Sequence, residues 1–141
     1  MEFNDMNRIA AALLVTCSVY LVGCQSGPPL PANAKVVTIM QNGSSINLKS
    51  GQMLVVQLER NPDTGFVWQL VRELDQGILM SDGTKDWKTP QEQANQSNLE
   101  TQLLRFVAQG QGETTVRLNY IRPEVGPTDN TTQFTVHVDV E

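Results

Sequence analysis

The chain of 141 residues contains only two cysteines and a single histidine, His137. Both cysteines, Cys17 and Cys24, lie near the N-terminus, so a domain built from the rest of the chain can form no disulfide bond. A single histidine nearly excludes a histidine-rich metal site or a histidine-based catalytic triad. We therefore expect neither a metal ion nor a cofactor.

Positive charge is also scarce. Ten lysines and arginines stand against 15 acidic residues, the formal net charge is −5 and the pI is about 4.8. No run of lysine or arginine exists, which argues against binding to nucleic acid and against electrostatic attachment to a membrane. With 40 % hydrophobic and 18 % charged residues and no internal repeat, the chain suits one compact domain with a short extension, expected to be a monomer.

The one long apolar run, residues 9–22, is too short for a membrane span but suits the core of a signal peptide. It ends in Leu21-Val22-Gly23-Cys24, which resembles a bacterial lipobox. That resemblance implies cleavage after residues 1–23 and a lipid on Cys24, with Met1 or Met6 as the start. The alternative is an ordinary secretory signal with a chance cysteine.

Residues 24–34 are predicted to be a lipidated, proline-rich tether, because three prolines favour an extended backbone. Gln25 stands where an aspartate tends to keep such lipoproteins at the inner membrane. Similarity to that sorting rule favours a location in the bacterial cell envelope, anchored in the outer membrane and facing the periplasm.

Residues 35–141 predict an all-β domain, because short runs with period-two alternation recur between turn residues. About seven to eight antiparallel strands in a β-sandwich or barrel are expected. The clearest runs are 35–40, 45–48, 53–59, 66–71, 99–108, 114–121 and 133–140, with shorter pieces at 77–80 and 86–88.

The connections between these runs carry the turn signals. Asn42-Gly43 predicts a hairpin, 81–83 a turn, and 89–98 a mobile loop without a helix. If strands alternate in direction, the connections 61–65, 89–98 and 122–130 emerge at one end of the domain. Loops at one end of a rigid sandwich commonly form a binding surface.

The connection Asn61-Pro62-Asp63-Thr64-Gly65 should be stiff and exposed. Pro62 fixes its own φ and pushes Asn61 out of the helical region, while Asp63 can bond its own backbone two residues on. Gly65 can adopt a positive φ. A polar loop held in this way by an apolar hairpin loses little entropy on binding.

The stretch from Asn61 to Trp68 resembles the first signature of the chagasin-type inhibitors of papain-like cysteine peptidases, usually Asn-Pro-Thr-Thr-Gly followed by an aromatic residue, a variable residue and Trp. The stretch from Tyr120 to Pro127 resembles the family's Tyr-x-Arg-Pro-Trp region and its following Gly-Pro. The resemblance covers most of residues 35–141. It implies an immunoglobulin-like β-sandwich without catalytic activity.

The resemblance also implies how the domain acts, by wedging three loops into the active-site cleft of a papain-like peptidase. The expected peptidase-binding residues are Asn61, Pro62, Asp63, Thr64, Gly65 and Phe66 in the central loop, and Arg122, Pro123 and Glu124 in a flanking loop. Thr64 is expected closest to the catalytic pair of the peptidase. Glu124 replaces the family's Trp, Asp63 replaces the commoner Thr, and the middle loop has no glycine at 94–98.

Two other functions are weighed against inhibition. The domain could be a protein-binding module of an envelope lipoprotein without inhibitory activity. Alternatively, Asp63-Thr64-Gly65 spells the aspartic-peptidase signature, in which two carboxylates share a proton. That chemistry requires the aspartate after a buried apolar strand, whereas Asn-Pro precedes it here and no second signature is apparent.

Overall fold

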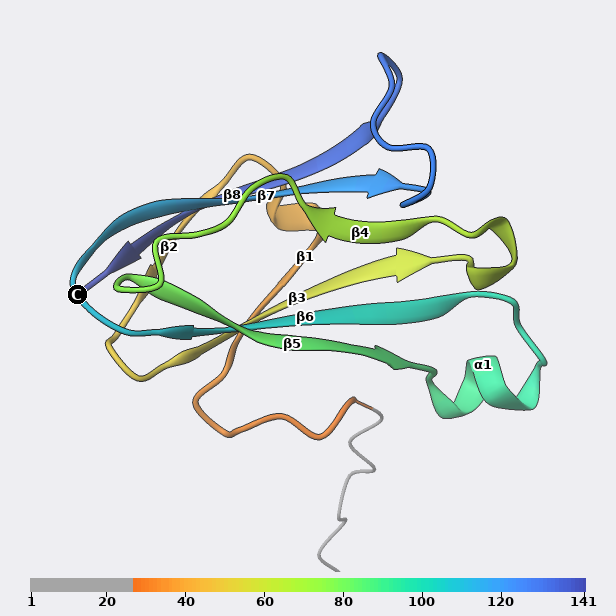
Figure 1. The fold of residues 1–141 in the computed structure, drawn as a ribbon. Helices are drawn as coiled ribbons and strands as arrows, with labels where there is room; N and C mark the ends of the chain where they lie inside the picture. The colour runs from red at the N-terminus through yellow and green to blue at the C-terminus, as the bar shows by residue number, and fades with distance from the viewer. Residues whose placement is uncertain (1–26) are drawn as a thin grey trace, which may run out of the picture.

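The computed structural model describes residues 27–141 and shows two four-stranded β-sheets packed face to face (Figure 1). The predicted β-sandwich is therefore confirmed. The predicted signal peptide and the lipid attachment at Cys24 lie outside the described residues. Within residues 27–141, no helix has the length and apolar character needed to cross a bilayer.

Each sheet mixes strand directions. The first sheet has the order β1 (Lys35–Thr38), β3 (Met53–Arg60), β6 (Glu100–Ala108) and β5 (Leu79–Trp87). The second has the order β2 (Ser45–Leu48), β8 (Thr132–Val140), β7 (Gly112–Ile121) and β4 (Val67–Leu70). Four neighbouring pairs are antiparallel, but β1 runs parallel to β3 and β2 runs parallel to β8, so the expectation of a wholly antiparallel sandwich was wrong.

Both predicted hairpins are instead crossings between the sheets. The chain passes from β1 to β2 through a short 3-10 helix, η1 (Ile39–Gln41), in which the Thr38 side chain and Gln41 cap each other. Likewise β3 and β4 belong to different sheets. The turn residues were recognised correctly, but turn chemistry does not reveal which sheet the next strand joins.

Two further local expectations fail. Residues 79–87 form one strand, β5, where a turn at 81–83 was expected; the register shifts between Ser81 and Thr84, and Gly83 has a φ of +91°. A bulge of this kind absorbs an extra residue without ending the strand. The polar stretch predicted as a mobile loop contains a short helix, α1 (Pro90–Ala94).

The core is made of the inward-facing side chains of both sheets, as the alternation predicted. Leucines and valines of β3 and β6 meet those of β7 and β8, and Phe106 and Phe134 are fully buried between them. Burial of large apolar side chains contributes about 1.5–3 kcal/mol each, which offsets the absence of disulfides.

The described part of the predicted tether lies along the outer face of the first sheet (Figure 1). Pro28 to Leu30 border a small cavity of about 40 Å³ together with Trp87 and Leu103. Gln52 Nε2 donates a hydrogen bond of 2.8 Å to the carbonyl of Asn33. The domain boundary at residue 35 stays a prediction, but the segment before it contacts the sandwich.

A buried glutamine ties the two sheets together beside the loop end. Gln102 on β6 is 4 % exposed, and its Oε1 accepts the backbone N–H of Trp68 at 2.9 Å. Its Nε2 donates to the backbone carbonyl of the same residue at 2.7 Å. The side chain thus takes the place of a neighbouring strand for the edge strand β4, which pairs only with β7 among the described strands.

Gln102→Ala should lower the free energy of unfolding by about 2 kcal/mol or more, because both backbone groups of Trp68 would stay buried without partners. Denaturant unfolding followed by tryptophan fluorescence measures this loss. Gln109→Ala is the control, since Gln109 is exposed and its replacement should change stability by less than about 0.5 kcal/mol. Equal effects of the two variants would show that the tie contributes nothing.

Candidate functional site

Three loops gather at one end of the sandwich (Figure 1). They are 61–66 between β3 and β4, 88–99 between β5 and β6, and 122–131 between β7 and β8. Arg60 links the bases of the first two, because its guanidinium lies 2.7 Å from Glu100 and 3.5 Å from Asp86. Arg122 links the first and third, because its Nε donates to the carbonyl of Thr64 at 2.9 Å. The predicted gathering of these loops is thus observed.

The central loop is closed by its own hydrogen bonds. Asn61 Oδ1 accepts the N–H of Asp63 at 3.0 Å and begins a 3-10 turn, η2 (Pro62–Thr64). Thr64 Oγ1 donates to the carbonyl of Asn61 at 2.7 Å. Gly65 ends the turn with a φ of +74°, a value that side-chain-bearing residues rarely adopt. The loop is therefore shaped before any partner arrives.

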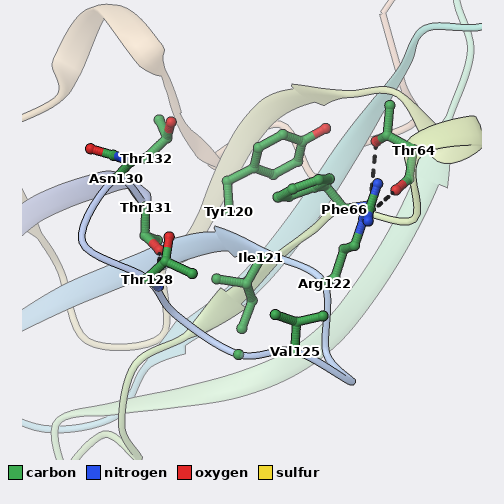
Figure 2. Close-up of a pocket in the computed structure, with 11 residues that line it drawn as sticks. Thr64, Phe66, Tyr120, Ile121, Arg122, Val125, Thr128, Asn130, Thr131 and Thr132 are labelled. Carbon is green, nitrogen blue, oxygen red and sulfur yellow. Dashed lines mark hydrogen bonds between the residues drawn. The ribbon is translucent and has the colours of Figure 1, made fainter.

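A column of aromatic rings supports this loop from below. The ring of Tyr120 stacks on Trp68 with a centroid separation of 4.9 Å and lies 5.2 Å from Phe66. Arg122 covers the other side of Phe66 at 5.0 Å (Figure 2). The Tyr120 hydroxyl accepts the backbone N–H of Asn61 at 3.1 Å. Ring contact and hydrogen bond together join the strand ends to the start of the loop.

The predicted site residues lie on two loops joined by the bond from Arg122 to Thr64, and they differ in exposure. Asp63, Thr64 and Gly65 are exposed at the tip, whereas Asn61, Pro62 and Phe66 are half-buried. Arg122, Pro123 and Glu124 are exposed on the neighbouring loop. Arg122 binds back to the central loop, so it also has a structural role that sequence reasoning did not foresee.

Sequence reasoning missed three contributors to this site. Gln102 and the Tyr120 hydroxyl position the loop, but their partners are distant in sequence and no local pattern identifies them. Val125 is 65 % exposed and lines a groove between the first and third loops. The sequence did contain a clue to Val125, because it is a large apolar residue within a mostly polar loop.

The second loop, 88–99, is ordered by helix α1. Thr89 accepts the N–H of Glu92 at 3.0 Å, and Glu92 accepts the N–H of Thr89 at 2.8 Å, which forms a capping box. Lys88 Nζ donates to the carbonyl of Ser97 at 2.8 Å and closes the loop behind the helix. The prediction of a mobile loop relied on the missing apolar stripe and overlooked the capping signal.

The aspartic-peptidase alternative gains no support from this geometry. Asp63 is exposed and lies inside the 3-10 turn, not at the end of a buried strand. A proton-sharing pair needs two carboxylates a few ångströms apart in a shielded position. Loops on a rigid scaffold more commonly carry binding residues.

Fold and site together define an immunoglobulin-like β-sandwich with hydrogen-bonded loops gathered at one end. The sequence model of the family described as "Chagasin family peptidase inhibitor I42" matches residues 47–138, and the chain belongs to this family. Members are peptidase inhibitors and not enzymes, which fits a protein without enzymatic activity.

Known relatives agree with this assignment. Chagasin of Trypanosoma cruzi is 28 % identical over 103 residues, which cover 72 % of this chain and 94 % of chagasin. The crystal structure of the cysteine protease inhibitor EhICP2 from Entamoeba histolytica matches with a TM-score of 0.67 at 18 % identity, covering 77 % of this chain and 96 % of that one. PbICP-C, solved in complex with falcipain-2, matches with a TM-score of 0.53 at 15 % identity, covering 81 % and 95 %.

Tyr120→Phe should loosen the central loop while leaving the sandwich intact, because it removes only the hydroxyl that accepts the Asn61 N–H. Loss of one such bond, about 1 kcal/mol, should speed amide exchange in 61–66 roughly fivefold. Hydrogen–deuterium exchange with mass spectrometry measures this, and the strand β8 (Thr132–Val140) serves as the internal control. Unchanged exchange in the loop would contradict the role given to the hydroxyl.

Proposed function

We propose that this protein is a reversible inhibitor of papain-like cysteine peptidases that occludes the active-site cleft with its three loops. The observation that carries the proposal is the central loop, which is closed by its own hydrogen bonds and supported by the aromatic column. A loop held in its binding conformation loses little entropy on association. PbICP-C, which shares the fold, was solved in complex with falcipain-2 and supports this class of partner.

Each loop has a defined part in the proposed complex. Thr64 at the exposed tip lies closest to the catalytic pair of the peptidase, and Pro62 and Gly65 hold it there. Arg122 and Pro123 grip one side of the cleft. The loop with helix α1 lies against the other side. A standard interface covers about 800 Å² on each partner, an area that three such loops can supply.

Inhibition blocks access and involves no chemical step. The described loops offer backbone and hydroxyl groups at the tip, and residues 27–141 contain no cysteine that could react with the peptidase. Binding is therefore reversible and stoichiometric. Its strength depends on how well the preformed tip fits the cleft.

A second candidate is a protein-binding module that has lost inhibitory activity. Glu124 favours it, because an exposed carboxylate stands where relatives of this type carry an aromatic anchor. Aromatic anchors often contribute about 2 kcal/mol or more to an interface, and a carboxylate buried there would need a cationic partner. Direct measurement of inhibition separates the two candidates.

Purified protein titrated into papain under reducing conditions should abolish hydrolysis of a fluorogenic substrate at a one-to-one ratio. Thr64→Ala should weaken inhibition about tenfold or more, because it changes the tip that enters the cleft. It should lower the melting temperature by no more than a few degrees, because the one hydrogen bond that it removes lies in an exposed loop. Thr64→Ser is the control, since it keeps the hydroxyl that bonds to Asn61. A well-folded protein that inhibits neither papain nor several cathepsins would leave only the binding module.

We also propose that the inhibitor is anchored to the bacterial cell envelope through a lipid on Cys24, in the outer membrane and facing the periplasm. The lipobox-like stretch ending at Cys24 supports this. Each buried CH₂ of an acyl chain contributes about 0.8 kcal/mol, so several chains on one cysteine hold firmly.

Cys24→Ser should move the protein out of the membrane fraction of an expressing bacterium, because the acyl chains need the thiol. Cys17→Ser is the matched control and should leave it in the membrane fraction, since Cys17 is removed with the signal peptide. Fractionation followed by immunoblotting gives the result. Retention of the Cys24→Ser variant in membranes would exclude this anchor.

A further inference from the structure

A groove of about 570 Å³ lies between the central loop and the loop 122–131 (Figure 2). One wall and the floor are apolar and consist of Phe66, Tyr120, Ile121 and Val125. Threonine side chains line the opposite wall, with Thr128 and Thr131 labelled in Figure 2. Val125 is 65 % exposed, which leaves a large apolar side chain facing water at the groove edge.

Both walls of the groove are held by local hydrogen bonds. The N–H groups of Val125 and Gly126 donate to the carbonyl of Arg122 at 3.0 and 2.9 Å. Across the groove, the N–H of Thr128 donates to Thr131 Oγ1 at 2.7 Å, and the N–H of Thr131 donates to the carbonyl of Thr128 at 3.1 Å. The groove is therefore formed in the free protein, which is typical of a site that accepts a partner side chain.

The charges around this groove are mainly negative. Asp63, Glu124 and Asp129 are exposed, and each is adjacent in the chain to a residue that lines the groove. Arg122 is the cation of the lining, and its guanidinium is engaged with the Thr64 carbonyl and the Phe66 ring. Three carboxylates against one guanidinium leave a formal charge of −2 at the rim.

We propose that this groove receives an apolar side chain from the rim of the target peptidase's cleft, beside a lysine or arginine that faces Glu124 and Asp129. This inference rests on the proposed inhibitory function and adds the chemistry of the partner. The groove opens beside the loop that enters the cleft, so the rim reaches it in the same docking event. A second copy of this chain is disfavoured as occupant, because its acidic rim would repel this one.

Replacing Val125 at the edge of the groove tests whether the groove receives an apolar side chain of the peptidase. Val125→Asp should raise the inhibition constant tenfold or more, because a carboxylate would face the apolar side chain of the peptidase. Val125→Leu should stay within threefold of the original protein. Val71→Asp is the matched control, since Val71 is an exposed valine just beyond β4, away from the groove, and its replacement should leave inhibition unchanged.

Three outcomes distinguish a failure of the groove proposal from a failure of the proposed inhibitory function. No inhibition by the original protein overturns both. Inhibition by the original protein that Val125→Asp leaves unchanged, or that Val71→Asp weakens equally, overturns the groove and leaves the inhibitory function standing. A selective loss in Val125→Asp, with an unchanged melting temperature, supports both.

Reversing the charge of Glu124 tests whether a basic residue of the peptidase faces the groove rim. With the peptidase that the protein inhibits most strongly, Glu124→Lys should slow association about tenfold at low ionic strength. The difference should shrink in about 0.5 M salt, because the Debye length there is only a few ångströms. Glu113→Lys is the control, an exposed glutamate at the other end of β7. Faster association of Glu124→Lys would mean that the peptidase rim is acidic and would overturn the basic partner.

Discussion

The hydroxyl and ring of Tyr120 hold the functional end of this molecule together. The ring stacks on Trp68 and contacts Phe66, while the hydroxyl accepts the N–H of Asn61, the first residue of the central loop. Strand β7, the edge strand β4 and the loop are thereby joined in one contact. Without that contact, only its two ends and its contacts with Arg122 would hold the loop to the sandwich, and a looser loop would lose more entropy in any complex.

In the proposed mechanism the loops act as a wedge, which needs a rigid sandwich below them, and residues 27–141 form that sandwich without disulfide bonds. Five connections cross between the sheets, namely β1–β2, β2–β3, β3–β4, β4–β5 and β6–β7, and Gln102 adds hydrogen bonds between the sheets. Buried polar groups are favourable only when fully bonded, and both ends of this amide are. The same glutamine therefore stabilises β4 and sets the position from which the central loop departs.

Much of the fold could be predicted from the chain, because alternation of apolar residues reports which strands bury one face. β8 and β7 were located almost residue by residue, and the stiff turn at Asn61 to Gly65 followed from its own residue types. The pairing of those strands could not be predicted. The two parallel pairs, and the two sheet crossings found where hairpins were expected, depend on the packing of distant segments, which a period-two pattern does not report. The bulge in β5 and the capped helix α1 were missed for local reasons, since a glycine or a polar run was taken as the end of structure.

For the site, the sequence by itself determined the turn that Pro62 and Gly65 impose on the central loop. That Asn61 to Phe66 and Arg122 to Glu124 bind a peptidase stays a prediction. Local backbone preferences act within a few residues, so they can be read from the chain. Only the tertiary structure decided what surrounds the tip. Arg122 turning back onto Thr64, the hydroxyl of Tyr120 beneath Asn61, and the groove beside Val125 arise from contacts between residues tens of positions apart. Such contacts form when two sheets pack, and no local pattern encodes them.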